Sequence, residues 1–156
     1  MARTSKRKVR LESQSLQENV SVKTYMAGIY ARLSVDNHDG KEISIETQIE
    51  MAKEYLKSHT EITLYDCYSD LGATGTNFQR SDFERLMQDV RDGLINCIIV
   101  KDFSRFGRNY IETGNFVEKI FPFLGVRFIA ITDQYDSIKQ ADCNEALSMH
   151  LKNIAN

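Results

Sequence analysis

The sequence predicts an α/β domain in which helices cover both faces of a largely parallel sheet. Short apolar runs typical of buried strands alternate along the chain with longer segments of helical periodicity. The strand-like runs carry apolar residues on both of their faces, as expected where helices cover both sides of a sheet. The chain has 156 residues, of which 42% are hydrophobic and 27% charged, enough for one such domain with its own core.

The first half of the chain supplies two strands and one helix to this prediction. A strand is expected at 26–33, where an apolar run ends in a polar segment. A helix should begin after Ser44, which suits the N-cap position, because the apolar residues that follow recur at helical spacing. A second strand is expected at 62–68, and a glycine-punctuated loop at 69–77.

The next helix and strand have clear boundaries. Ser81 and Glu84 form the capping-box pattern, in which the two side chains start a helix by bonding each other's backbone N–H groups. That helix should stop at Gly93. Its apolar face consists of Phe83, Leu86, Met87 and Val90. The run at 97–100 is wholly apolar and predicts a central buried strand.

The last third of the chain predicts a helix, a strand and the start of a further helix. The first of these helices covers about 110–121 and should end at Pro122, the only proline. A strand is expected at 126–131 and a polar loop at 132–140. A last helix should begin near Ala141, and its apolar stripe is unfinished at the end of the sequence.

These elements divide the chain into three parts. Residues 1–25 hold six basic and two acidic residues, a balance of +4, and are expected to form a flexible basic tail. The α/β domain should cover 26–140, and 141–156 should be the start of a long helix within a longer chain. Because the whole chain has a net charge of −2, the remainder carries −6. Any nucleic-acid contact in the domain must therefore come from a local cluster of arginines.

Several classes of protein are disfavoured by composition. No apolar stretch approaches the roughly 18 residues of a membrane span, and no signal peptide is visible at the start. The three cysteines are odd in number and widely spaced, which favours neither a zinc site nor a disulfide framework. We therefore expect a cytoplasmic protein that uses no metal and no other cofactor.

Arginines and one serine lie where the predicted strands end or the next helices begin. They are Arg32, Ser34, Arg80, Arg105 and Arg108. Ligands of open parallel sheets meet the carboxyl ends of the strands, so one cleft could gather these side chains. Arginine binds phosphate through paired hydrogen bonds and stabilises the charge of its transition state, whereas serine can act as a nucleophile. The three histidines have no partner placed to complete a catalytic triad.

Four motifs, in this order, resemble the catalytic domain of the resolvase/invertase, or serine recombinase, family. They are Tyr30-x-Arg32-x-Ser34, then Ser44-Ile45-Glu46-Thr47-Gln48, then Asp70-x-Gly72-x-Thr74-Gly75 with Arg80, and finally Ser104-Arg105-Phe106-Gly107-Arg108. The resemblance covers about 26–156. The last motif is most similar to the large serine recombinases of conjugative transposons.

The resemblance implies a three-layer fold and an enzyme that cuts and rejoins double-stranded DNA for excision or insertion of a mobile element. Ser34 would form a 5′-phosphoserine link, while the four arginines bind the scissile phosphate. Tyr30, Gln48, Asp70 and Ser104 would support the site. The family works without metal or ATP, and it associates from dimers to tetramers through the long helix that would begin at 141–156.

One departure from the family concerns Ser104. Small resolvases carry an aspartate there, and Asp102 is out of register with that position. An acid–base role for Ser104 is therefore doubtful, and the general acid and base stay unassigned. Two alternatives stay open at this point: a non-catalytic regulatory or assembly module on the same fold, and a phosphotransferase or hydrolase acting on small phosphoesters.

Overall fold

The computed structural model describes residues 22–33, 43–71, 80–107 and 109–139. A five-stranded sheet in the order β2-β1-β3-β4-β5 forms its middle layer. The strands are β1 (Tyr25–Leu33), β2 (Ile62–Leu71), β3 (Cys97–Val100), β4 (Arg127–Ala130) and β5 (Tyr135–Asp136). The first four strands are parallel to their neighbours, and β5 is antiparallel to β4. The prediction of a largely parallel sheet with β3 at its centre is confirmed.

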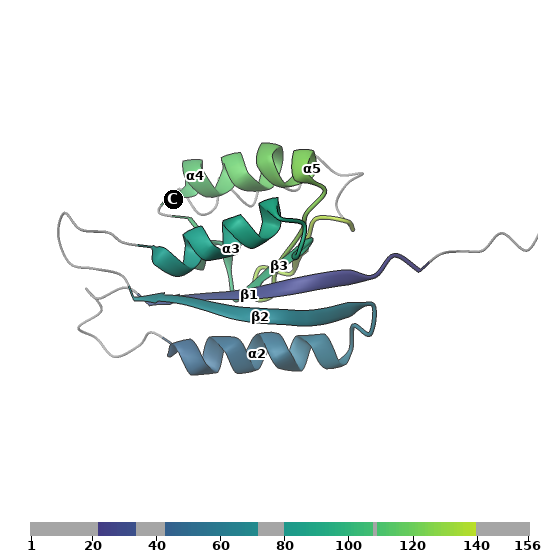
Figure 1. The fold of residues 1–156 in the computed structure, drawn as a ribbon. Helices are drawn as coiled ribbons and strands as arrows, with labels where there is room; N and C mark the ends of the chain where they lie inside the picture. Colours follow the sequence, from purple (N-terminus) through teal and green to yellow (C-terminus); the bar gives the residue numbers. More distant parts are fainter. Residues whose placement is uncertain (1–21, 34–42, 72–79, 108, 140–156) are drawn as a thin grey trace, which may run out of the picture.

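Helices cover both faces of this sheet (Figure 1). They are α2 (Ile45–Lys57), α3 (Ser81–Arg91), the 3₁₀ turn η1 (Phe103–Arg105), α4 (Tyr110–Asn115), the π-helical turn η2 (Phe116–Ile120) and α5 (Phe121–Leu124). Helix α2 lies on one face, whereas α3 and the continuous run from α4 to α5 lie on the other. The three-layer architecture is therefore confirmed.

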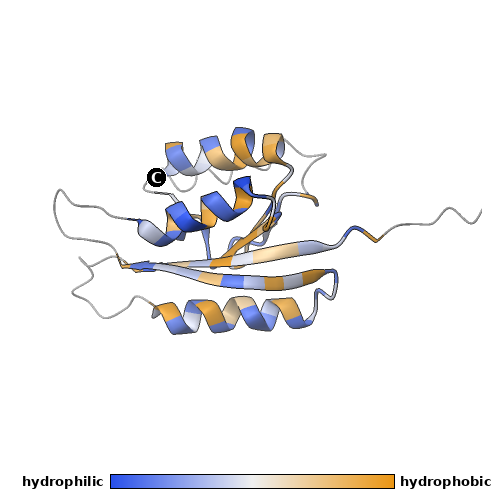
Figure 2. Cartoon of the chain, in the orientation of Figure 1, coloured by the Kyte–Doolittle hydropathy of each residue, from blue (hydrophilic) through white to orange (hydrophobic). Residues whose placement is uncertain are grey.

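The core forms two apolar layers, because alternate strand residues point to opposite faces. Ile29 and Ile99 pack with Ala52 of α2, whereas Ile98 packs with Leu86 of α3. In Figure 2 the helices show alternating hydrophobic and hydrophilic bands, as amphipathic surface helices do. The N-cap predicted for α2 is confirmed, since the Ser44 hydroxyl accepts a hydrogen bond of 3.2 Å from the backbone N–H of the third helical residue.

Strand β2 is longer than predicted. It continues to Leu71, so the first three residues of the expected loop at 69–77 belong to the strand. Asp70 lies beside Arg32 in the register of β1 and is buried. The acidic residue favoured the prediction of a loop. The groups that bond its buried carboxylate lie in β1 and α3, so the sequence of β2 does not reveal them.

The capping box predicted at the start of α3 is wrong. Ser81 is the first helical residue and is exposed, and Arg80 at the N-cap makes no side-chain capping bond. The Asp70 carboxylate of β2 does the capping instead, accepting bonds of 3.0 and 2.9 Å from the N–H groups of Asp82 and Phe83. A carboxylate also suits the positive end of the helix dipole.

Pro122 does not end its helix, contrary to the prediction. It lies in the first turn of α5, and the helix runs on to Leu124 before Gly125 stops it with a left-handed φ of 69°. The π-helical turn η2 precedes it and changes the hydrogen-bond register, so the proline occupies a helix start, where it is tolerated. The predicted apolar position Ile111 is 67% exposed.

The polar loop predicted at 132–140 contains the short strand β5. Tyr135 and Asp136 pair with the end of β4 and are buried. Arg127 of β4 donates hydrogen bonds of 3.0 and 2.6 Å to the two carboxylate oxygens of Asp136. Strand β1 begins at Tyr25, inside the predicted tail, while 1–21 and the helix expected from Ala141 lie outside the described residues.

Candidate active site

Three arginines from separate segments meet at the carboxyl edge of the sheet. Arg32 is the last residue but one of β1, Arg80 directly precedes α3, and Arg105 belongs to the turn that follows β3. The Arg32 Nη2 donates to the backbone carbonyls of Ser104 at 2.6 Å and Gly107 at 3.3 Å. In return, Arg105 Nη1 donates to the Arg32 carbonyl at 3.4 Å. The end of β1 and the turn after β3 are therefore held together by the arginines themselves.

Arg80 is buried, and its guanidinium contacts several parts of the fold at once. Its Nε and Nη2 each donate to the Tyr30 hydroxyl at 3.3 Å, and Nη2 also donates to the Phe106 carbonyl. The guanidinium carbon lies 3.7 Å from the centre of the Phe83 ring, which allows a cation–π interaction. On the remaining edge, Nη1 lies 3.6 Å from a Glu112 carboxylate oxygen.

The positive charges influence one another. Burial lowers the pKa of Arg32, and the charge of Arg80 lowers it further, although Tyr30 and Glu112 act in the opposite direction. The pKa of Arg105 is lowered by burial and then by the charge of Arg32. Neighbouring cations that are partly desolvated gain from an anion placed between them. The cluster is therefore suited to a phosphate.

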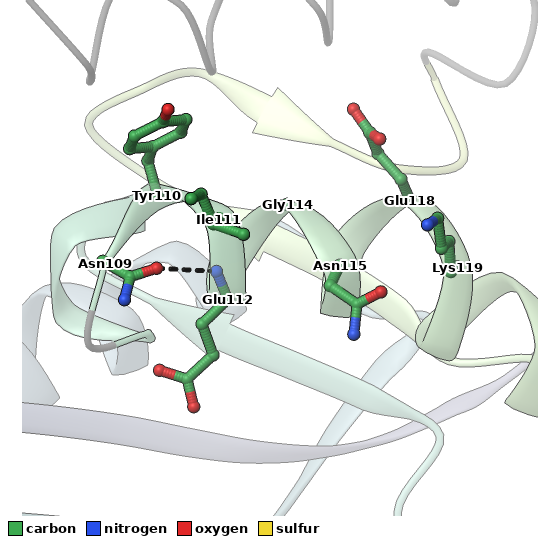
Figure 3. A pocket seen from close by; sticks show the side chains of 8 residues that line it. All are labelled: Asn109, Tyr110, Ile111, Glu112, Gly114, Asn115, Glu118 and Lys119. Carbon is green, nitrogen blue, oxygen red and sulfur yellow. Dashed lines mark hydrogen bonds between the residues drawn. The ribbon is translucent and has the colours of Figure 1, made fainter.

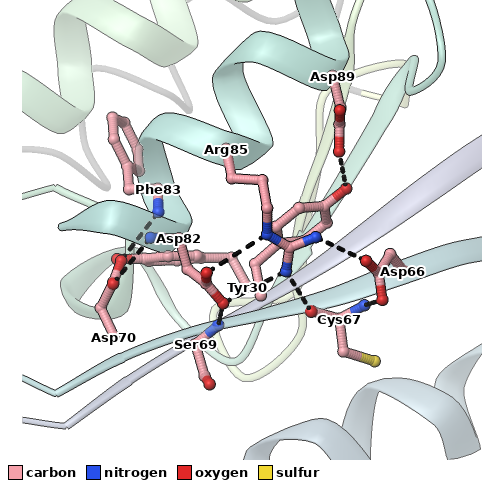
Figure 4. A network of polar contacts seen from close by, with 10 residues as sticks. Tyr30, Asp66, Cys67, Ser69, Asp70, Asp82, Phe83, Arg85 and Asp89 are labelled. Carbon is pink, nitrogen blue, oxygen red and sulfur yellow. Dashed lines mark hydrogen bonds and ion pairs between the residues drawn. The ribbon is translucent and has the colours of Figure 1, made fainter.

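Tyr30 and Asp70 form a buried pair beneath this cluster. The Tyr30 hydroxyl donates a hydrogen bond of 2.9 Å to Asp70, whose carboxylate also caps α3 (Figure 4). Burial raises the pKa of Tyr30, so the phenol stays protonated at neutral pH. Tyr30 is thus placed to orient Arg80 and Asp70, because it accepts from one and donates to the other.

Gln48 fixes the end of β1 from the side of α2. Its side chain is buried, and its amide forms hydrogen bonds with both backbone groups of Arg32: Oε1 accepts from the N–H at 3.3 Å, and Nε2 donates to the carbonyl at 3.2 Å. Nε2 also donates to the Ile43 carbonyl at 2.9 Å. One side chain thus positions the two backbone segments on either side of 34–42.

Ser104 lies at the exposed rim of the cluster and bonds to an acidic neighbour. Its hydroxyl donates to Asp102 Oδ1 at 2.5 Å, and Lys101 Nζ lies 2.6 Å from Asp102 Oδ2. In the sequence, Asp102 lies two residues before the position at which small resolvases carry an aspartate. In the structure, this hydrogen bond places its carboxylate beside Ser104, which occupies that position.

Comparison with known proteins identifies the family. The family model described as "Resolvase, N terminal domain" matches residues 27–154. The chain belongs to the resolvase family. No curated protein sequence matches this resolvase domain significantly.

Solved structures share the fold of this resolvase domain. The catalytic domain of TP901-1 integrase is 22% identical with a TM-score of 0.63, over 83% of this chain and 91% of that one. A resolvase family site-specific recombinase from Streptococcus pneumoniae is 23% identical with a TM-score of 0.62, over 85% and 86%. The catalytic domain of ISC1926 TnpA, an IS607-like serine recombinase, is 18% identical with a TM-score of 0.54, over 83% and 96%.

The resolvase domain brings together most of the residues singled out in the sequence. Arg32, Arg80 and Arg105 lie in one cluster, supported by Tyr30, Gln48, Asp70 and Ser104. Ser34 and Arg108 lie outside the described residues. The sequence did not predict that Glu112 belongs to the site. Asn109 and Glu112, three residues apart, indicate the start of a helix, but this pattern does not indicate that the Glu112 carboxylate lies beside Arg80.

The described part of the resolvase domain holds neither a cluster of metal ligands nor a membrane-spanning helix. Among the described residues, no group of three or more His, Cys, Asp or Glu side chains could hold a metal ion. No helix in the described part of the chain is long and apolar enough to cross a membrane.

Proposed function

We propose that this resolvase domain is the catalytic domain of a site-specific DNA recombinase that excises or inserts a mobile element. The observation that carries the proposal is the convergence of Arg32, Arg80 and Arg105 at the end of β1, two residues before Ser34. Three guanidinium groups from distant segments supply the positive charge and the N–H donors that bind phosphodiester oxygens.

In the proposed reaction the Ser34 hydroxyl attacks a DNA phosphorus and loses its proton. The bond to the 3′ oxygen breaks, and that oxygen leaves as a 3′-hydroxyl after taking up a proton. The 5′ phosphate stays on the serine as a phosphodiester, so the energy of the broken bond is conserved. A 3′-hydroxyl from the exchanged strand then attacks the phosphoserine, which reseals the DNA and releases Ser34.

The arginines have distinct parts in this scheme. Arg32, Arg105 and Arg108 would bind the scissile phosphate, and Arg80 would stabilise the added negative charge as the fifth oxygen approaches. Loss of one such preorganised donor typically costs about 10²–10³ in rate. The guanidinium groups supply the charge neutralisation that a metal ion gives in other phosphoryl-transfer enzymes.

The supporting residues would set the geometry of these groups. Tyr30 and Asp70 hold Arg80 beside α3, and Gln48 fixes the backbone next to the nucleophile segment. Ser104 would link Asp102 to the rim of the site, where a proton has to move during each transfer step. The scheme needs no nucleotide cofactor, since each step exchanges one phosphodiester for another.

The scheme also implies how the remaining segments contribute. Double-stranded DNA is the proposed substrate, and paired sites require the chain to associate from dimer to tetramer. The basic segment that precedes β1 would contact the DNA backbone, and the domain from Tyr25 to about residue 140 would carry the chemistry. The helix expected at 141–156 would join the subunits. Cytoplasmic location is part of the same proposal.

A covalent protein–DNA adduct is the decisive test. The complete recombinase is incubated with DNA that carries the ends of its element, denatured, and examined for protein bound to 5′ ends. The wild type should give an adduct on the peptide that contains Ser34, and Ser34→Ala should give none. Ser69→Ala, which changes an exposed serine of β2, serves as the matched control and should keep the adduct. An adduct from Ser34→Ala would overturn the assignment of Ser34 as the nucleophile. No adduct from the folded wild-type protein would overturn the proposal and favour a non-catalytic module.

A further inference from the structure

The Glu112 carboxylate lies at the edge of the arginine cluster. Glu112 belongs to α4, and Figure 3 shows its side chain pointing away from the helix on the side opposite Tyr110 and Glu118. Its Oε1 lies 3.6 Å from Nη1 of Arg80. Glu112 also acts electrostatically on Arg32, at the end of β1. A negative charge therefore already lies beside Arg80.

The contacts of Arg80 with Tyr30, Phe83 and Phe106 use other parts of its guanidinium than Nη1. Nε and Nη2 donate to the Tyr30 hydroxyl, Nη2 also donates to the Phe106 carbonyl, and the flat face packs on Phe83. Tyr30, Phe83 and Phe106 are all buried, so this edge of Arg80 is fixed by the core. An incoming phosphate could not replace these contacts without disturbing the packing of these three aromatic rings.

The contact with Glu112 differs from these in two ways. The Glu112 side chain is 30% exposed, whereas that of Arg80 is 3% exposed, so solvent reaches the pair from the carboxylate side. A carboxylate and a phosphate also present the same kind of group, an anionic oxygen pair, to a guanidinium. Nη1 is thus the edge of Arg80 at which one anion can exchange for another.

Resting on the proposed function, we infer that Glu112 is a built-in counter-ion that occupies the anion position beside Arg80 until a DNA phosphate displaces it. Arg80 then stays neutralised and correctly oriented in the absence of DNA. Binding of a phosphate must break the contact, so Glu112 weakens non-productive binding of anions. Glu112 is a positioning residue in this scheme, because it acts through Arg80.

The test measures phosphate binding at Arg80 in solution. The 156-residue chain is labelled with ¹⁵N, and the arginine Nε–H resonance of Arg80 is followed during titration with inorganic phosphate. In Glu112→Gln the dissociation constant for phosphate should fall by roughly tenfold relative to the wild type, because a like charge beside the site has been removed. Glu118→Gln removes the same charge from the next turn of this helical run but on the other side, and should stay within about twofold of the wild type.

The outcomes separate this inference from the proposed function. Phosphate shifts at Arg80 with an unchanged or larger dissociation constant in Glu112→Gln would overturn the counter-ion role alone. If phosphate moved the Arg80 resonance in neither the wild type nor any variant, the anion site itself, and with it the proposed function, would fail. Glu112→Asp is the second variant: it keeps the charge but withdraws it from Nη1, and should give a constant between those of the wild type and Glu112→Gln.

Discussion

The Tyr30 hydroxyl donates a hydrogen bond of 2.9 Å to Asp70, and the same carboxylate accepts the first free N–H groups of α3. One buried acid therefore connects β1, β2 and α3, the helix that directly follows Arg80. Removing it leaves a buried phenol and two helix N–H groups without their acceptor, which is more costly than losing the bonds themselves.

Asp70→Ala should consequently destabilise the domain strongly. We expect the free energy of unfolding to fall by about 3–5 kcal/mol, since several buried donors lose their charged partner. Tyr30→Phe removes one bond to Asp70 and the hydroxyl that accepts from Arg80, but it leaves the cap of α3 in place and should cost less, about 1–3 kcal/mol. Urea unfolding followed by circular dichroism measures both changes, and equal losses from the two variants would contradict the role assigned to Asp70.

Gln48→Ala should loosen the end of β1. The variant removes the side chain that bonds both backbone groups of Arg32, although Arg105 Nη1 still donates to the Arg32 carbonyl. The expected loss is about 1–3 kcal/mol. Hydrogen exchange should accelerate at the Arg32 amide before it does so in β3. Gln88→Ala, at an exposed position of α3, is the control and should leave this amide unchanged. Unaltered exchange in Gln48→Ala would show that β1 is held by other contacts.

The domain should lose stability at alkaline pH. Burial raises the pKa of Tyr135 to about 12 and that of Cys97 to about 12. Unfolded tyrosine and cysteine titrate near 10 and 8.5, so the unfolded chain releases protons first as the pH rises. The neutral forms stabilise the fold below about pH 9, and this contribution disappears between about pH 9 and 12.

Tyr135→Phe isolates one part of that pH dependence. The variant cannot ionise at this position, so its free energy of unfolding should decline less steeply between pH 9 and 12 than that of the wild type. Tyr65→Phe, which alters an exposed tyrosine of β2, is the matched control. Urea unfolding at pH 8 and pH 11 measures the difference, and parallel curves for the wild type and Tyr135→Phe would refute the assignment.

Arg85 covers the open edge of β2. Its guanidinium donates to the Cys67 carbonyl at 3.1 Å and pairs with Asp66 and Asp82, while Asp82 accepts from the Ser69 N–H at 2.9 Å (Figure 4). Backbone groups at a sheet edge otherwise invite pairing with another chain. Arg85→Ala should therefore increase self-association, measured by sedimentation velocity over a range of concentrations. Arg91→Ala, an exposed change on the same helix, should not.

The elements that depend on local pattern could be predicted from the sequence. The wholly apolar β3 and the amphipathic α3 lie where periodicity placed them, since burial of an apolar face decides both. The arginines could be assigned to one edge because parallel strands end together. The contacts of these arginines could not be predicted. Arg80 binds Tyr30 and Glu112, which lie far from it in the sequence, and no local pattern indicates such pairings.

The failed predictions share that origin. Ser81 carried a local capping signal, but the acid from β2 took its place. Pro122 reads as a stop only if the helix before it keeps the α register, and the π-helical turn changes that register. Strand β5 has two residues, too few for alternation to show, and depends on Arg127 for its position.

Covering of the β2 edge also limits the ways in which copies of the chain can join. On the far side of the sheet, β5 offers only a two-residue border, which is too short to template a further strand. Arg85 and Asp82 therefore obstruct strand addition at the Cys67 and Ser69 part of β2, and the short length of β5 limits it at the other margin of the described sheet. Pairing of folded domains is therefore favoured through helical surfaces or through segments outside the described ones. Such a subunit contact can form or separate while the strands that position the arginines stay paired.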